Sequence, residues 1–152
     1  MREITFMISE EDANKKVEEG YFRAWTIFEA LAINENVAKD ALETLINKLD
    51  KDIRVKIYKK SFGGVKKVEK PIQGVEVGYS LTCEVCLVSK SFDNLSQIVM
   101  EYGPSALEIL EPEKIKMDAG EAQSVLNSIS QMMHRLAAVG AGGIVFMKSD
   151  NE

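Results

Sequence analysis

The most regular hydrophobic pattern in the chain covers residues 75–88. Apolar side chains alternate there with mostly polar ones, and this period of two predicts a strand with one face on a core. Residues 92–102 instead repeat at helical spacing, directly after Ser91, whose hydroxyl can cap a helix. Gly103 suits the end of that helix, and alternation resumes over residues 107–109. Strand, helix and strand in this order predict a β-α-β crossover.

The N-terminal pattern begins with alternation and then changes to helical spacing. Residues 4–8 alternate and predict a first strand, and Ser9 is placed to cap a helix. Apolar positions at helical spacing then predict one helix that extends to about Ala32. Gly20 lies inside this pattern and costs about 1 kcal/mol relative to alanine if the helix is continuous. A bend or a close neighbour at Gly20 would explain its presence.

A second helix and a second strand are predicted before the long alternating segment. Asn34 can cap a helix whose apolar stripe extends from Val37 to Leu49. Residues 53–57 then alternate as a strand, and a long polar connection leads from there to residue 75. We expect the strand over residues 53–57 to lie antiparallel beside the strand over residues 75–88.

The C-terminal quarter predicts a long helix that starts after Asp118, with Glu121 three residues later as in a capping box. Its apolar stripe extends to Leu136, and residues 140–143 end it with three glycines. Residues 144–147 predict a short edge strand. The predicted order β-α-α-β-β-α-β-α resembles a ferredoxin-like α+β sandwich with an inserted N-terminal helix and an added C-terminal helix.

Composition is that of an ordinary soluble protein. The chain has 152 residues, of which 45% are hydrophobic and 28% are charged, and we expect residues 1–152 to form a single α+β domain. Its apolar runs are all shorter than the ~20 residues that cross a bilayer, and residues 1–8 do not resemble a signal peptide. Two cysteines without a secretory signal favour a reducing cytoplasm. We therefore expect a cytoplasmic protein with no membrane partner.

Candidate catalytic and metal-binding residues are few. Cys83 and Cys86 have the spacing of redox and metal motifs, but on a strand their thiols would point to opposite faces. His134 is the only histidine, and it lies in the last predicted helix without a nucleophile motif elsewhere. We expect no catalytic residue, no metal ligand and no cofactor. Carboxylates or lysines that are distant in sequence could also converge in three dimensions to form an active site. An enzyme of this kind is a weaker hypothesis than the binding functions described below.

Three carboxylates, Glu108, Glu111 and Glu113, follow the predicted crossover. They could bind a hard cation, but the spacing does not match a calcium-binding loop. A solvated sheet edge is the simpler interpretation.

Charge is distributed unevenly along the chain. Residues 51–70 contain eight basic residues and two acidic ones, although the whole chain has a net charge of −5. With Tyr58 and Phe62 between them, these residues could bind phosphates while the rings stack on bases. Lysines also keep an exposed strand soluble, and seven of the eight are lysine rather than the arginine preferred for base readout. The candidate anion-binding or nucleic-acid-binding residues are Arg54, Lys56, Lys59, Lys60, Lys66, Lys67 and Lys70.

Two resemblances rest on the segment after the long alternating strand. A helix that ends in Tyr102-Gly-Pro and is followed by Ile109-Leu-Glu-Pro112 resembles the C-terminal extension of WYL-domain transcription regulators, over about residues 75–135. The same motifs, with the long helix after them, resemble small archaeal and bacterial proteins of unassigned function. The second resemblance would cover most of the chain and implies no catalytic residues.

The leading functional hypothesis is a non-enzymatic binding module that works by association as a homo-oligomer. The alternative is a nucleic-acid-associated regulator that uses the basic residues of 51–70.

Overall fold

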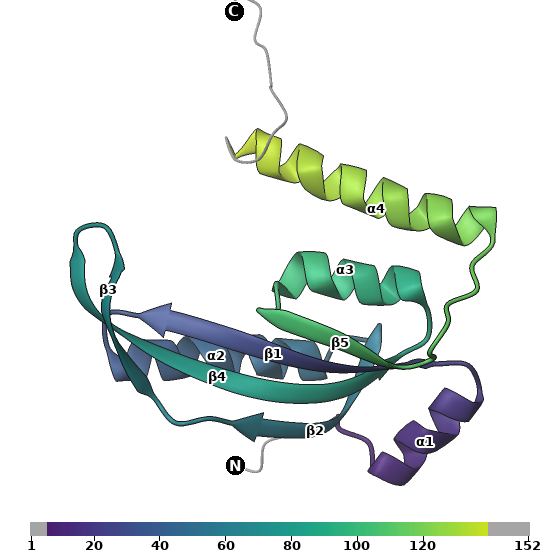
Figure 1. Ribbon diagram of the computed structural model, residues 1–152, viewed down its shortest axis with the longest axis horizontal. Coiled ribbons are helices and arrows are strands. Elements are labelled where there is room, and N and C mark those ends of the chain that lie inside the picture. The colour runs from purple at the N-terminus through teal and green to yellow at the C-terminus, as the bar shows by residue number, and fades with distance from the viewer. Residues whose placement is uncertain (1–5, 140–152) are drawn as a thin grey trace, which may run out of the picture.

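The computed structural model describes residues 6–139, which form four helices and five strands (Figure 1). In chain order they are α1 (Glu10–Glu18), β1 (Phe22–Ala32), α2 (Glu35–Asp50), β2 (Val55–Phe62), β3 (Lys66–Ile72), β4 (Val75–Ser89), α3 (Phe92–Tyr102), β5 (Ala106–Glu111) and α4 (Ala119–Ala138). The chain is therefore a mixed α+β protein, as its sequence predicts.

The strands form one antiparallel sheet in the order β2-β4-β1-β5, and β3 pairs with the N-terminal part of β4. Since β1 and β2 both lie antiparallel to β4, they are parallel to each other, and α2 connects them. In the same way β4 and β5 are parallel on either side of β1, and α3 connects them. The predicted strand, helix and strand over residues 75–109 are thus confirmed, with β1 inserted between the two strands.

The hydrophobic core lies on one face of the sheet, beneath α2 and α3. Phe28 of β1 and Leu87 of β4 are fully buried, and so are Leu42 and Ile46 of α2. Leu95 and Ile98 of α3 complete the same cluster. We call this the helix face of the sheet and the opposite side the outer face. Helix α1 contacts β2 and β4 at one end of the outer face, where Asn14 accepts a hydrogen bond from Arg23.

The predicted helix to Ala32 is wrong beyond residue 18. Helix α1 ends at Glu18, and Gly20 has φ +103°, a backbone conformation that glycine adopts without the usual steric cost. Residues 22–32 then form β1. Positions 24 and 28 fit both a helical period and a strand period, and aromatic and β-branched residues fill the segment, which favours a strand.

Two other segments differ from their predictions. Residues 6–8 belong to no strand, although the Ile8 amide donates to the Ile57 carbonyl beside β2, and residues 1–5 lie outside the described part. The predicted polar connection folds as the end of β2 and as β3, because its lysines alternate along strands that pair with β4. The predicted order of elements is therefore wrong at both places. The edge strand predicted over residues 144–147 lies outside the described residues.

The predicted starts of α2, α3 and α4 are confirmed, whereas the glycines predicted to end α4 lie outside the described residues. The side chains of Asn34, Ser91 and Asp118 each accept a hydrogen bond from a backbone amide in the first turn of α2, α3 and α4. Gly103 ends α3 with φ +58°. Within residues 6–139, each helix is too short or too polar to cross a bilayer.

Candidate functional site

Arg54 is held in a network of ion pairs between α2, β2 and α3. Its guanidinium donates to both oxygens of Asp52, at 2.9 and 2.6 Å, and also pairs with Glu101. The hydroxyl of Tyr102 donates to Asp52 at 2.8 Å. The hydrogen bonds from Arg54 are the main reason that the pKa of Asp52 falls from 3.8 to about 2. Arg54 is one of the seven candidate basic residues, and its charge is already paired with the carboxylates of Asp52 and Glu101.

The six candidate lysines lie along one edge of the sheet, because β2 and β3 pair with successive parts of β4 on the same side. Each of the six is without an ion pair to any residue from 6 to 139. The cross-strand register divides them between the two faces of the sheet. Lys56, Lys59 and Lys66 pair with positions of β4 that point to the outer face, whereas Lys60 and Lys67 pair with positions on the helix face.

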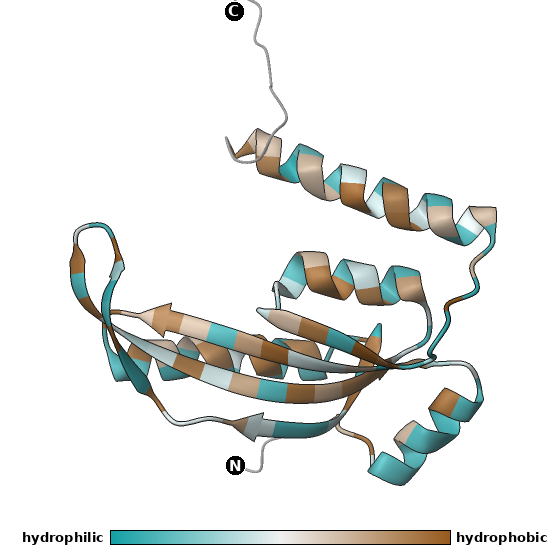
Figure 2. Ribbon diagram, viewed as in Figure 1, coloured by the Kyte–Doolittle hydropathy of each residue, from teal (hydrophilic) through white to brown (hydrophobic). Residues whose placement is uncertain are grey.

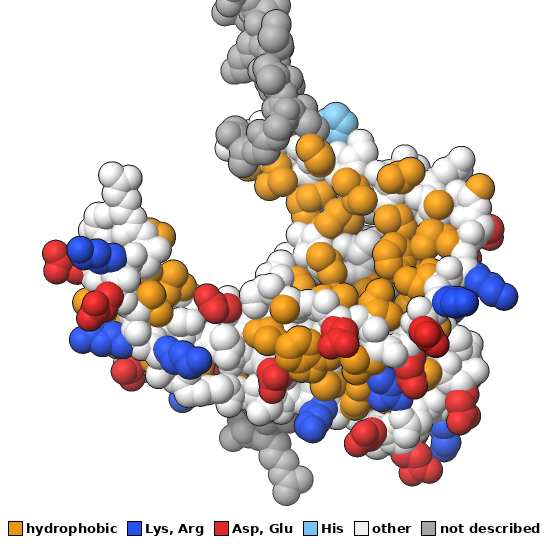
Figure 3. Space-filling model, viewed as in Figure 1, with side chains coloured by type: hydrophobic (Ala, Val, Ile, Leu, Met, Phe, Trp, Pro, Cys, Tyr) orange, Lys and Arg blue, Asp and Glu red, His pale blue; other side chains and the backbone are white. Residues whose placement is uncertain are grey.

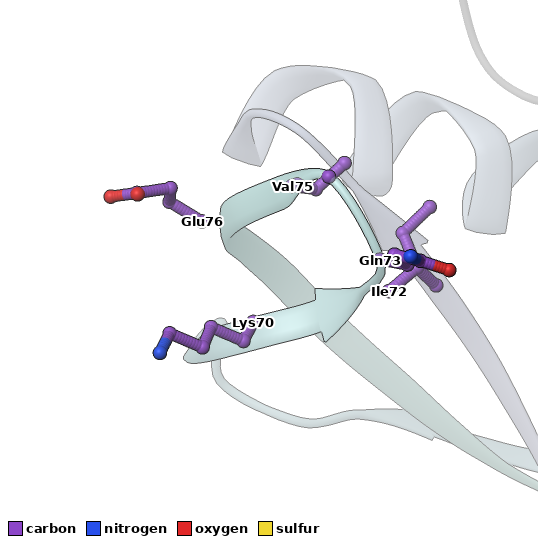
Figure 4. Close-up of a pocket in the computed structure, with 6 residues that line it drawn as sticks. Lys70, Ile72, Gln73, Val75 and Glu76 are labelled. Carbon is purple, nitrogen blue, oxygen red and sulfur yellow. The ribbon is translucent and has the colours of Figure 1, made fainter.

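The turn between β3 and β4 carries charges of both signs. In Figure 4, Lys70 and Glu76 extend to the same side of this turn, while Ile72 and Gln73 lie at its other end. These residues line a cavity of about 320 Å³. The opposite charges on one side make this cavity a poor site for an anion.

The cysteine pair behaves as its position on a strand predicts. Cys83 pairs with Phe28 on the helix face and is buried, whereas Cys86 pairs with Trp25 on the outer face. Burial raises the pKa of the Cys83 thiol, which lowers its reactivity as a nucleophile. Two thiols on opposite faces of one strand cannot ligate the same ion.

Glu111 belongs to a second polar cluster, on the outer face. Arg23 donates to Glu111 at 2.9 Å, and its guanidinium lies 5.1 Å from the centre of the Tyr58 ring. Burial raises the pKa of Tyr58. Among residues 6–139, His, Cys, Asp and Glu do not form any group of three that could hold a metal ion.

Helix α4 forms where it is predicted, but its apolar stripe is exposed. It packs on α3, on the side away from the sheet (Figure 1), and none of its residues is buried. Hydrophobic residues recur on its successive turns (Figure 2), and hydrophobic side chains gather over α3 and α4 on the face seen in Figure 3. The exposed fractions are 64% for Leu126, 42% for Ile129, 38% for Met133 and 40% for Leu136.

A model of the MJ0538 family matches residues 23–148 of the chain. The chain belongs to this family. The match covers β1 to α4, so the core, the basic edge and the exposed helix all lie within the part that this MJ0538-family protein shares with the family model. It agrees with the expected resemblance to a family of small proteins over most of the chain, and it gives no link to WYL-domain regulators. No match was found among curated proteins or among solved structures.

The sequence contains a signal for the exposed face of α4 that the apolar periodicity alone does not reveal. In this MJ0538-family protein 28% of residues are charged, yet residues 122–134 contain no Asp, Glu, Lys or Arg. A solvated helix normally carries charges on its open side, whereas protein interfaces are depleted of them and enriched in Met. Met133 lies in the exposed stripe and not in the core, because α3 is the one element of residues 6–139 that packs extensively on α4.

Proposed function

We propose that this protein is a binding module that associates with a second copy of itself through α4. The observation that carries the proposal is the exposed stripe formed by Leu126, Ile129, Met133 and Leu136. These positions are separated by three, four and three residues, the spacing at which two helices pack side by side with interlocking side chains. Ala119 and Ala122 extend the same stripe toward the start of the helix.

The stripe is complementary to itself when two copies of α4 lie antiparallel. A twofold axis between residues 127 and 128 places Leu126 of one copy against Ile129 of the other. The same axis places the small Ala122 against the long Met133, and Ala119 against Leu136. Large residues thus meet small ones toward the ends and fill the contact evenly. A symmetric contact of this kind closes on itself and gives a dimer rather than a filament.

The dipole of α4 supports the same orientation. In the antiparallel pair, the N-terminal end of one helix lies beside the C-terminal end of the other, so the two helix dipoles oppose each other favourably. A parallel pair would place like ends side by side. This self-complementarity favours a second copy over an unrelated partner.

Self-association is tested by the mass of the protein in solution. We expect sedimentation velocity to show a dimer of the 16.9 kDa chain at micromolar concentration. Ile129→Glu places a charge in the centre of the stripe and should weaken the dimer at least tenfold, since an unpaired charge is costly to desolvate. Asn127→Glu adds the same charge on the exposed side of α4 that faces neither the stripe nor α3 and should leave the dimer unchanged.

Circular dichroism would verify that both variants keep their helical content. A wild-type chain that stays monomeric at micromolar concentration would refute the proposal. Equal dimer strength in Ile129→Glu and Asn127→Glu would show that the contact lies elsewhere.

A second candidate function is nucleic-acid binding along the basic edge of the sheet. Its support is that the six lysines have no ion-pair partner among residues 6–139, so their charges are free to meet phosphates. The outer face carries Lys56, Lys59 and Lys66, and the ring of Tyr58 lies there with Arg23. We favour this face for a nucleic-acid strand, since a ring beside a cationic edge can stack on bases.

The division of the lysines between two faces provides a matched pair of variants. Lys59→Glu/Lys66→Glu changes the outer face, and Lys60→Glu/Lys67→Glu makes the same charge change on the helix face. With fluorescent single-stranded RNA at low salt, we expect the outer-face variant to bind at least tenfold more weakly than the other. Wild-type binding should also weaken steeply as salt rises. Equal losses in the two variants, or no binding at low salt, would contradict this candidate.

We further propose that the fold is ferredoxin-like. Supporting this is the succession β1-α2-β2-β4-α3-β5, in which two strand-helix-strand units interlock to give the strand order β2-β4-β1-β5. In this proposal β3 is an extension of the hairpin between β2 and β4, and α1 and α4 are additions at the two ends.

A further inference from the structure

A cavity of about 370 Å³ lies at one end of the sheet, where three connections meet. The connections are those from α1 to β1, from β4 to α3 and from β5 to α4. They come together because β4 and β5 are parallel and end on the side where β1 begins. The register Phe22 to Ser89 and Arg23 to Glu111 fixes this neighbourhood.

The walls of this cavity combine cationic and apolar groups. Lys90 comes from the connection before α3, while Lys114 and Lys116 come from the connection before α4. The half-buried rings of Phe22 and Phe92 also line the cavity, with their centres 6.1 Å apart. Ile115 and Pro112 add to the apolar part of the wall.

Cationic side chains outnumber anionic ones on the wall of the cavity. All three lysines are exposed, and no described residue forms an ion pair with them. Glu121 is the one carboxylate on the wall against these three ammonium groups. The nearby Asp93 is turned to other partners, since its two oxygens accept hydrogen bonds from Gln97 and Ser128, both at 3.2 Å. The cavity therefore has a net positive charge.

We propose that this cavity binds a phosphorylated small molecule that carries a flat ring, of the nucleotide class. The three ammonium groups would contact the phosphates, which gain most from several cations converging from different directions. The ring would lie against Phe22, Phe92 and Ile115, because an apolar wall beside polar anchors is typical of small-molecule sites. Lysines that served only to keep the surface soluble would not need to line the same cavity as half-buried aromatic rings.

The proposal is tested by calorimetric titration of the full chain with ATP at low salt. Lys114→Glu/Lys116→Glu should weaken ATP binding at least tenfold. Lys67→Glu/Lys70→Glu on β3 makes the same change in net charge far along the sheet and should leave ATP binding unchanged. Ile115→Ser should weaken binding severalfold without changing any charge. All of the substituted residues are exposed, so we expect these variants to fold.

Two further probes separate the phosphate part from the ring part. Inorganic tripolyphosphate carries the charge alone, and adenosine carries the ring alone, so we expect each to bind at least fivefold more weakly than ATP. No ATP binding by the wild type at low salt would overturn the proposal. Equal losses in the two double-lysine variants would also overturn it, because the attraction would then be diffuse. Tripolyphosphate binding as tightly as ATP would overturn the assignment of a ring-bearing ligand.

Discussion

Phe28→Ala is expected to lower the free energy of unfolding by about 3–5 kcal/mol. Phe28 is fully buried in the core that α2 and α3 form with the helix face of the sheet, and no part of its ring contacts water. Removing the ring loses its burial and leaves a cavity that the strands on either side can close only partly. Urea unfolding at a single protein concentration measures the change, and the melting temperature should fall by roughly 10 °C.

Phe62→Ala is the matched control for this prediction. It removes the same ring from the end of β2, where 42% of the side chain is exposed. We expect it to change the free energy of unfolding by less than about 1 kcal/mol. If the two variants lost equal stability, Phe28 would not occupy the centre of the core, and the assignment of residues 22–32 to a buried strand would fail.

The elements with strong local signals are the ones that the sequence predicts correctly. Asn34, Ser91 and Asp118 cap helices because their side-chain oxygens satisfy amides of the first turn, an interaction contained within four residues. The alternation in β4 persists over residues 75–88, long enough to exclude a helical period. Such signals do not depend on what packs against the element.

Residues 22–32 show where local patterns become ambiguous. Apolar positions at 24 and 28 are four apart, a spacing that lies on one face of a helix and also on one face of a strand. The side chains between these two positions favour a strand. Pairing with β4 on one side and with β5 on the other then fixes that structure. That pairing joins positions about 60 and 85 residues apart, which no local period contains.

The candidate sites are harder to predict than the fold, because each depends on contacts between distant parts of the chain. Periodicity shows that α4 is amphipathic, but it does not show that α3 is its only extensive contact within residues 6–139. The cavity at the end of the sheet joins Phe22, Lys90 and Lys116, which only the sheet topology brings together. The basic residues of 51–70 formed the most visible cluster in the sequence, yet strand alternation divides them between two faces. Proximity in sequence is therefore a poor guide to proximity on a sheet.

Asp52→Asn is expected to lower the free energy of unfolding by about 2 kcal/mol at pH 7. The Asp52 carboxylate accepts hydrogen bonds from Arg54 and Tyr102, and the first of these is the main cause of its low pKa of about 2 in the folded protein, against an ordinary value of 3.8. A carboxylate with a lowered pKa stabilises the folded state wherever it is ionised. The amide of the variant still accepts hydrogen bonds but has lost the charge that Arg54 faces.

The same pKa difference fixes how the effect changes with pH. The stabilisation is complete above pH 3.8, where Asp52 is ionised in both states, and it is lost as the pH falls toward 2. Urea unfolding at several pH values should therefore show the gap between wild type and Asp52→Asn closing between about pH 4 and pH 2. Asp40→Asn removes the same charge from an exposed site on α2 that has no ion pair to a described residue. For Asp40→Asn we expect a small change in the free energy of unfolding that does not depend on pH in this way. If the difference between wild type and Asp52→Asn stayed constant down to pH 2, the charge-assisted role of Asp52 would be refuted.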